Sequence, residues 1–198
     1  MREAVARTMI AALATPIFRV TAELRIGPLL GVAKRANISG NVLVARAVAL
    51  AIKQHPIFNA VYRPKGIAQR ARVDIGIAVD MSEGLITPVL RAVGERSAAA
   101  LTEEWRGLVE MAMARRLPAA NYRGATFYLS DLGVFPVVHA FDAIIPAGAS
   151  ALLSVAAIRN ETALCTLNCD HRVVFGADAA RFLQTLETII ANPETLAG

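Results

Sequence analysis

The chain opens with apolar residues at helical spacing and continues with residues that alternate between apolar and polar. Apolar side chains recur every three or four positions between Val5 and Leu13, which predicts an amphipathic first helix that Pro16 ends. Residues 18–24 alternate and predict a strand. Ser39 is a good N-cap for an apolar helix. After the first helix, helices are predicted over residues 28–35, 42–53, 97–116 and 177–191.

Between these helices lie short runs that are β-branched or alternating and that turn residues separate. They predict strands over residues 58–62, 66–69, 73–80, 85–93, 125–130, 141–145, 151–158 and 162–169. Helices and mostly antiparallel strands in this order predict a two-layer α/β sandwich, with helices on one face of a mixed, largely antiparallel sheet. No linker, low-complexity tract or repeat divides residues 1–198, so a single domain is expected.

The composition fits a chain that buries a substantial core. Of its 198 residues, 55% are hydrophobic and 19% are charged, so neither disulfides nor metals are needed for stability. The mean hydropathy is +0.46, yet no apolar run approaches the roughly 18 residues of a membrane span. We therefore expect no membrane association and expect the apolar excess to be buried inside the fold or between subunits.

The charge pattern does not support nucleic-acid binding. The net charge of +5 comes from scattered arginines, and the longest basic run is Arg115-Arg116. Mild positive charge suits an anionic small molecule, and a phosphate-bearing cofactor such as coenzyme A fits. Cys165 and Cys169 match no metal or redox spacing, which predicts buried, inert thiols in a reducing cytoplasm.

The segment Cys169-Asp-His-Arg-Val-Val-Phe-Gly176 places His171 at the end of a predicted strand, shortly before a helix. Reactive groups are often fixed at such junctions, although a single histidine without a readable partner is more often structural. Ser130, taken alone, is most simply a strand-end residue that bonds the local backbone. His55 and His139 have no companions at metal-ligand spacing, so no metal site is predicted and both are expected at the surface.

Three segments in order nevertheless resemble the catalytic core of the dihydrolipoamide acyltransferases of 2-oxo-acid dehydrogenase complexes, within the chloramphenicol acetyltransferase-like superfamily. Residues 169–176 resemble that family's Asp-His-Arg-x-x-Asp-Gly-Ala signature, and residues 124–133 resemble its Gly-Gly-Thr-Phe-Thr-Ile-Ser-Asn-Leu-Gly. Residues 73–89 resemble its central strand pair. The stretches 2–7, 55–60 and 182–193 extend the likeness over nearly the whole chain.

The resemblance implies a chloramphenicol acetyltransferase-like fold and transfer of an acyl group between a lipoyl thiol and coenzyme A. It implies that His171 is the general base and that Ser130 donates a hydrogen bond to the oxyanion. It also implies that Ser39 and Asn41, at the helix start on the coenzyme side, contact coenzyme A. The expected assembly is a homotrimer in which adjacent subunits supply the histidine and the serine of one site, with a free trimer favoured over a larger shell. The lipoyl domain and the dehydrogenase subunits are the other expected partners.

The chain also departs from the family's pattern. Phe175 replaces an acidic or amide residue, Pro146-Ala-Gly-Ala149 replaces Asn-Pro-Pro-Gln or Asn-Pro-Pro-Glu, and Val42 replaces an aspartate. No lipoyl domain and no peripheral-subunit-binding domain is recognisable, so another domain or chain is expected to supply the lipoyl group. Two alternatives follow: a trimeric scaffold whose site has decayed, or a stand-alone acetyltransferase of the chloramphenicol type.

Overall fold

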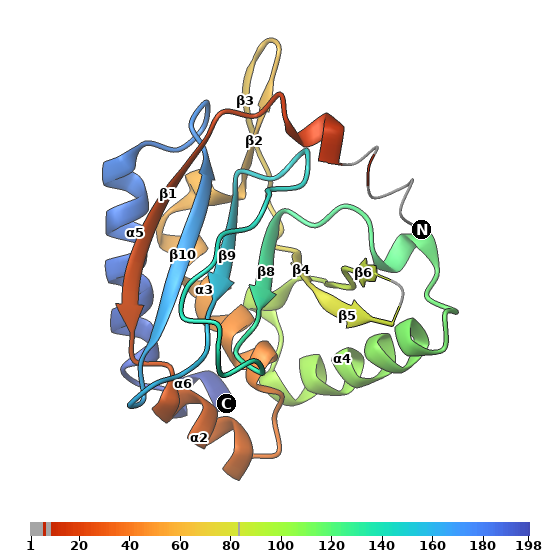
Figure 1. The fold of residues 1–198 in the computed structure, drawn as a ribbon, viewed down its shortest axis with the longest axis vertical. Helices are drawn as coiled ribbons and strands as arrows, with labels where there is room; N and C mark the ends of the chain where they lie inside the picture. Colours follow the sequence, from red (N-terminus) through yellow and green to blue (C-terminus); the bar gives the residue numbers. More distant parts are fainter. Residues whose placement is uncertain (1–5, 7–8, 83) are drawn as a thin grey trace.

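The computed structural model describes residues 6, 9–82 and 84–198. Within this part of the chain, six strands form one mixed sheet in the order β1-β10-β9-β8-β4-β7 (Figure 1). The pairs β1–β10, β10–β9 and β4–β7 are antiparallel, whereas β9–β8 and β8–β4 are parallel. Two short hairpins, β2–β3 and β5–β6, lie outside this sheet.

The strands are β1 (Ile17–Leu24), β2 (Ala60–Arg63), β3 (Gly66–Gln69), β4 (Ile75–Ile77), β5 (Val79–Met81), β6 (Gly84–Ile86), β7 (Val89–Leu90), β8 (Phe127–Asp131), β9 (Ala151–Val155) and β10 (Ala163–Asp170). The helices are α2 (Gly27–Arg35), α3 (Gly40–Gln54), α4 (Ala98–Met113), α5 (Gly176–Ile190) and α6 (Glu194–Ala197), with 3-10 turns at Pro56–Asn59, Val93–Glu95 and Ala119–Asn121.

The main core lies between the sheet and the helices. Because side chains alternate along a strand, every second residue of the central strands points toward the helices. These inward residues include Phe127 and Leu129 of β8 and Cys165 of β10, all fully buried. Helix α3 packs against α2, α4 and α5, which explains why it is apolar on nearly every side. The predicted two-layer α/β sandwich is confirmed.

Most predicted elements form, with one clear exception. Residues 141–145 are not a strand but part of a long loop between β8 and β9. Ile145 of this loop packs with Ala149 and Leu152 on the sheet face opposite the helices. The alternating pattern there reflects a loop that covers a sheet, not a strand within one. The start of the first helix and part of the turn after β5 lie outside the described residues, but residues 9–12 are helical.

A buried carboxylate accepts hydrogen bonds from several segments near one edge of the sheet. Asp74, which precedes β4, accepts a forked pair of hydrogen bonds from Arg72 at 2.7 and 2.8 Å and one from Arg91 at 3.0 Å. The N–H of Ala92 donates to the same carboxylate at 3.0 Å. Burial alone would raise the pKa of Asp74, but these hydrogen bonds outweigh it and hold the pKa below its usual value.

Arg91 extends this cluster to the loop before β8. Its guanidinium also donates to the carbonyl oxygens of Ala120, Arg123 and Gly124. The cluster therefore joins β4, β7 and the loop that leads into β8, the strand that carries Ser130. None of the described helices is long and apolar enough to cross a membrane.

Candidate active site

His171 is the first residue after β10, in the turn that leads into α5. Its backbone N–H donates to the carbonyl of Pro16 at 2.9 Å, and its side chain is exposed. The N–H of Asp170 donates to the carbonyl of Ser150 at 2.8 Å. The backbone on which His171 sits is therefore bonded to the segments on both sides of β10.

Asp170 fixes the turn itself. Its buried carboxylate accepts from the backbone N–H of Arg172 at 3.0 Å and from both ends of the Arg172 guanidinium at 2.9 and 2.8 Å. Its carbonyl accepts from the N–H groups of Val173 and Val174, both at 2.9 Å. The Arg172 guanidinium in turn lies 4.5 Å from the centre of the Tyr62 ring. Charge-assisted, forked bonds of this kind hold a turn in one conformation.

The imidazole of His171 is in contact with two aromatic rings. Its ring centre lies 4.5 Å from that of Phe18 and 5.9 Å from that of Phe175. Among the described residues, no side chain or backbone group is hydrogen-bonded to its ring nitrogens. Both nitrogens are therefore open to a group from outside the described chain, as a general base requires.

Ser130 lies on β8 and faces away from the helices, because its neighbours Phe127 and Leu129 point into the main core. It pairs with Ser154, which pairs with Thr166, which pairs with Thr21. Four hydroxyl side chains therefore form a row across four strands. The two threonine hydroxyls at one end are hydrogen-bonded to each other at 3.0 Å.

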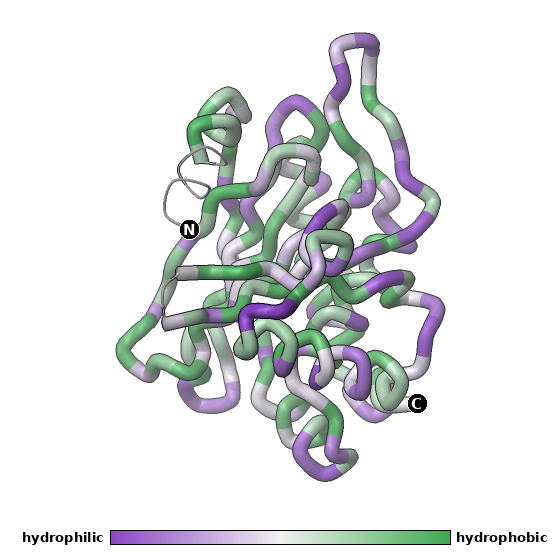
Figure 2. The backbone as a smooth tube through the Cα atoms, turned by 90° about the vertical axis from the view of Figure 1, so that its right-hand side faces the viewer, coloured by the Kyte–Doolittle hydropathy of each residue, from purple (hydrophilic) through white to green (hydrophobic). Residues whose placement is uncertain are grey.

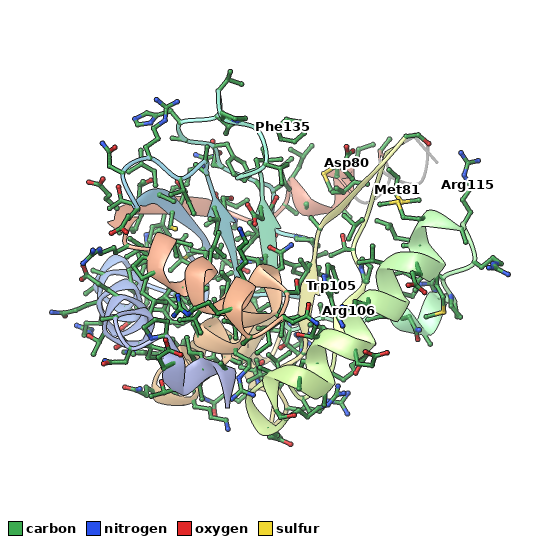
Figure 3. All side chains as sticks on the ribbon, turned by 90° about the horizontal axis from the view of Figure 1, so that it is seen from below. Asp80, Met81, Trp105, Arg106, Arg115 and Phe135 are labelled. Carbon is green, nitrogen blue, oxygen red and sulfur yellow. The ribbon has the colours of Figure 1, made fainter. Side chains whose placement is uncertain are left out.

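Ser130 also lines a cavity of about 670 Å³. The cavity lies between β8, the β5–β6 hairpin, the C-terminal end of α4 and the loop before β9, and its lining is mostly apolar: Met81, Ile86, Leu117, Tyr128, Ile144 and Leu152. Figure 3 shows Met81 and Arg115, which both border it, on the same side of the molecule. A cavity of this size and polarity is typical of a small-molecule site.

Within one chain the structure does not bring Ser130 and His171 together. The strand register aligns Ser130 with Thr166, which lies five residues before His171 and two strands away. At about 3.4 Å per residue and about 4.8 Å per strand, the two residues are about 20 Å apart. No group on either can reach the other inside a single chain.

Ser39 and Asn41 stand apart from both residues. Ser39 is the N-cap of α3 with an extended backbone, but its hydroxyl makes no capping bond, and Asn41 is half-buried in the first turn. Ser39 borders a separate, shallow hollow beside Trp105 and Arg106 of α4, which are labelled in Figure 3. The same helix reaches the main cavity at Ala112, so α4 runs from one site to the other.

The other ionisable candidates have structural positions. Cys165 and Cys169 lie in the core, and burial raises the pKa of each thiol to about 12, as expected for inert cysteines. His55 is half-buried, not simply at the surface, because its Nε2 is 2.8 Å from the hydroxyl of Thr185 on α5. His139 is exposed in a loop, as predicted. Within the described residues, no three histidine, cysteine or acidic side chains are grouped to hold a metal.

The carboxylate of Asp131, next to Ser130, destabilises the folded state when it is ionised. Burial raises the pKa of its carboxyl, although its Oδ1 accepts the N–H of Gly133 at 2.7 Å. When folding raises the pKa of a carboxyl, the folded protein loses stability as the pH rises from about 4 through the raised pKa. The family segment that residues 124–133 resemble has an asparagine here, which would keep the Oδ1 acceptor without the charge.

We therefore expect Asp131→Asn to raise the melting temperature at pH 7, because it removes the buried charge and keeps the acceptor for Gly133. The difference from the parent should shrink as the pH falls toward 4, because the parent carboxyl then becomes neutral. Thermal unfolding from pH 4 to 8 measures it, with exposed Asp80→Asn as the control. An equal gain at every pH would contradict the assigned ionisation.

Comparison with known proteins identifies the family of this chain. Residues 1–197 match the family model described as 2-oxoacid dehydrogenases acyltransferase (catalytic domain). The chain belongs to this family. A chloroplastic relative from Arabidopsis thaliana, the dihydrolipoyllysine-residue acetyltransferase component 4 of the pyruvate dehydrogenase complex, is 35% identical over 99% of this chain. The chain spans 44% of that relative's length.

Solved structures of this acyltransferase family share the fold. The cubic core of a pyruvate dehydrogenase multienzyme complex superimposes with a TM-score of 0.87 at 29% identity, over 99% of this chain and 90% of that chain. Dihydrolipoamide acetyltransferase from Azotobacter vinelandii gives 0.88 at 28% identity, over 98% and 90%. Chloramphenicol acetyltransferase gives 0.63 at 17% identity, over 93% and 94%, which confirms the superfamily fold.

The Azotobacter vinelandii structure comes from a study of one serine, one histidine and one asparagine in the catalytic mechanism of that acyltransferase, the asparagine four positions after the histidine. The residue four positions after His171 is Phe175.

The contacts of Phe18 and Tyr62 with the region around His171 were not predictable from the sequence, because both residues come from distant segments without a local signal. The charges that flank His171, Asp170 and Arg172, were visible, but their forked bond was not.

Proposed function

We propose that this chain transfers an acyl group between coenzyme A and a dihydrolipoyl group, at a site that two copies of the chain build together. The observation that supports this most is the separation of the two candidate residues. Ser130 borders an apolar cavity, while the exposed imidazole of His171 is about 20 Å away in the same chain. A second copy that brings its His171 to this cavity would complete the site.

In this reaction His171 takes the proton from the attacking thiol, and the thiolate attacks the thioester carbonyl of the acyl donor. A thiol with a pKa near about 8.5 is mostly protonated at neutral pH, so a positioned base accelerates the step. The carbonyl oxygen becomes an oxyanion, to which the Ser130 hydroxyl donates a hydrogen bond. The intermediate then expels the second thiolate, which takes the proton back from His171.

The cavity suits the apolar part of such substrates. Its aliphatic and aromatic lining would bury the hydrocarbon arm of a lipoyl group or the thiol end of coenzyme A beside Ser130. Ser39 and Asn41 stay predictions as coenzyme contacts, since neither lines this cavity and Ser39 borders a separate hollow. Coenzyme A and the lipoyl group are both substrates here, and no metal is part of the proposal.

Exposed apolar residues favour assembly with further copies. Val134, Val137 and Ile144, all in the loop between β8 and β9, are exposed in a single chain, and Ile144 also lines the cavity. A homotrimer, as the building block of a larger shell, would cover this surface, and a lipoyl domain and dehydrogenase subunits are the further partners we propose. The cytoplasm stays a prediction, because the family includes chloroplastic and mitochondrial relatives.

The test of this function is acyl transfer from acetyl-, succinyl- and isobutyryl-coenzyme A to free dihydrolipoamide. Removal of one oxyanion donor costs about a hundred- to a thousand-fold in kcat, so Ser130→Ala should lower kcat by that factor. Ser154→Ala removes the neighbouring hydroxyl of the same row, outside the cavity lining, and is the matched control. Equal activity of the parent and Ser130→Ala would contradict the proposed role.

A second candidate function is a trimeric scaffold without catalysis. Phe175 favours it, because a phenyl ring cannot supply the hydrogen bonds of an acidic or amide side chain. A parent protein that is folded and oligomeric but transfers no acyl group from any of the three donors would support the scaffold.

A further inference from the structure

Phe175 has an unusual position for an apolar residue. Its side chain is 62% exposed, yet its ring lies beside the imidazole of His171. The ring centres are 5.9 Å apart and the ring planes meet at 66°, an edge-to-face arrangement within the range that aromatic pairs prefer. An exposed phenyl ring gains little from contact with water. The contact with the His171 ring is therefore the interaction that accounts for the position of the Phe175 ring.

The backbone of Phe175 is held firmly. It is the N-cap of α5, its N–H donates to the carboxylate of Asp178 at 3.2 Å, and its carbonyl accepts from the N–H groups of Asp178 and Ala179. Val173 and Val174, which connect it to His171, are buried. The Phe175 ring therefore projects from a rigid helix start, at a fixed offset from His171.

A second ring contact with the imidazole comes from β1. The ring of Phe18 lies 4.5 Å from that of His171, with the planes at 46°. A histidine side chain has two rotatable bonds, and one neighbouring ring restricts them only from one side. Two rings at different angles restrict both. This matters because a general base must lie within about 2.6–3.2 Å of the proton that it removes.

We propose that Phe175 is a positioning residue that orients the His171 imidazole by ring contact, in place of the polar side chain that relatives carry at this position. The inference rests on the proposed function, in which His171 is the base. Positioning by a ring occupies neither imidazole nitrogen, so one stays free for the thiol proton and the other for a polar group of the neighbouring copy. Phe175 acts only through His171 and touches no reacting atom.

Three variants separate ring contact from other roles. Phe175→Ala removes the ring, Phe175→Tyr keeps it, and Phe175→Asn supplies the polar residue found in the Azotobacter vinelandii relative. A small misplacement of a catalytic group costs up to about a hundred-fold, so we expect kcat to fall about ten- to a hundred-fold in the Ala and Asn variants. KM for both substrates should stay near the parent value, and Phe175→Tyr should keep most of kcat.

A second readout does not depend on activity. The chain has three histidines, so the ring-proton signals in its NMR spectrum can be assigned by single substitutions. Close aromatic rings shift these signals. The His171 signal should move toward the position of a free imidazole in Phe175→Ala and Phe175→Asn, but not in Phe175→Tyr. Ile67→Ala, at an exposed position of β3, is the control and should change neither signal nor kcat.

The outcomes distinguish this inference from the proposed function. An unchanged His171 signal in Phe175→Ala overturns the positioning role, whatever the activity. Activity of Phe175→Asn at or above that of the parent also overturns it, because the phenyl ring would then be a defect. A shifted His171 signal in a chain that transfers no acyl group supports the positioning and counts against the proposed function alone.

Discussion

Replacement of His171 by alanine is expected to lower kcat for acyl transfer by about a hundred- to ten-thousand-fold, the contribution of a positioned general base. The attacking thiol must then lose its proton without a positioned base. KM should change little, because the imidazole acts on the proton and is not needed to hold the substrate. Steady-state kinetics with acetyl-coenzyme A and dihydrolipoamide at pH 7 measure both quantities.

The control for this variant is His55→Gln. His55 lies between α3 and α5, where it is bonded to Thr185, and glutamine keeps a hydrogen-bonding group there. Its activity should equal that of the parent. If His171→Ala retains parent activity while it stays folded, His171 is not the base, and its turn has only a structural role.

Replacement of Asp74 by alanine is expected to cause the largest loss of stability. The buried carboxylate accepts hydrogen bonds from Arg72, Arg91 and Ala92, and its removal leaves these donors without their common acceptor. Disruption of a buried ion pair costs about 3–5 kcal/mol. In a chain of this size about 1 kcal/mol shifts the melting temperature by about 2–4 °C, so we expect a fall of at least about 6 °C.

The loss should depend on pH in a definite direction. Because the folded state lowers the pKa of Asp74, its stabilising effect is complete well above the unfolded carboxyl pKa of about 3.9 and is lost as the pH falls below it. Parent and variant should therefore converge in acid. Arg35→Ala is the control, since its pair with Glu194 is 67% and 74% exposed, and exposed pairs contribute about 0–1 kcal/mol. Equal effects of both variants would contradict the account.

The regular elements were predictable from the sequence because their patterns are local. The alternation in residues 18–24 predicted β1, and the apolar run after Ser39 predicted α3. The strand predicted over residues 141–145 was wrong, because an apolar loop that packs on a sheet has the same alternation as a strand. The strand predicted over residues 66–69 forms as β3, and Figure 2 shows the β2–β3 hairpin as a projection with hydrophilic residues at its tip.

The candidate site was only partly predictable. His171 and Ser130 were found through a resemblance of short segments, since neither residue has a partner nearby in sequence. The resemblance implied that adjacent subunits supply the two residues, but no local pattern gives their separation within the chain, because it depends on the strand order and register. The contact of Phe18 with His171 joins residues from β1 and the end of β10, and the sequence contains no local sign of it.

The central claim is that His171 of one copy and Ser130 of another build one site. The most direct measurement is the activity of a mixed assembly, made by co-expression of His171→Ala and Ser130→Ala chains in equal amounts with different purification tags. Where an intact His171 meets an intact Ser130 across a head-to-tail interface, the site is complete, so random mixing restores about a quarter of parent activity. Each variant assembled alone stays nearly inactive. A mixed assembly that contains both chains and is no more active than either variant alone would contradict the shared site.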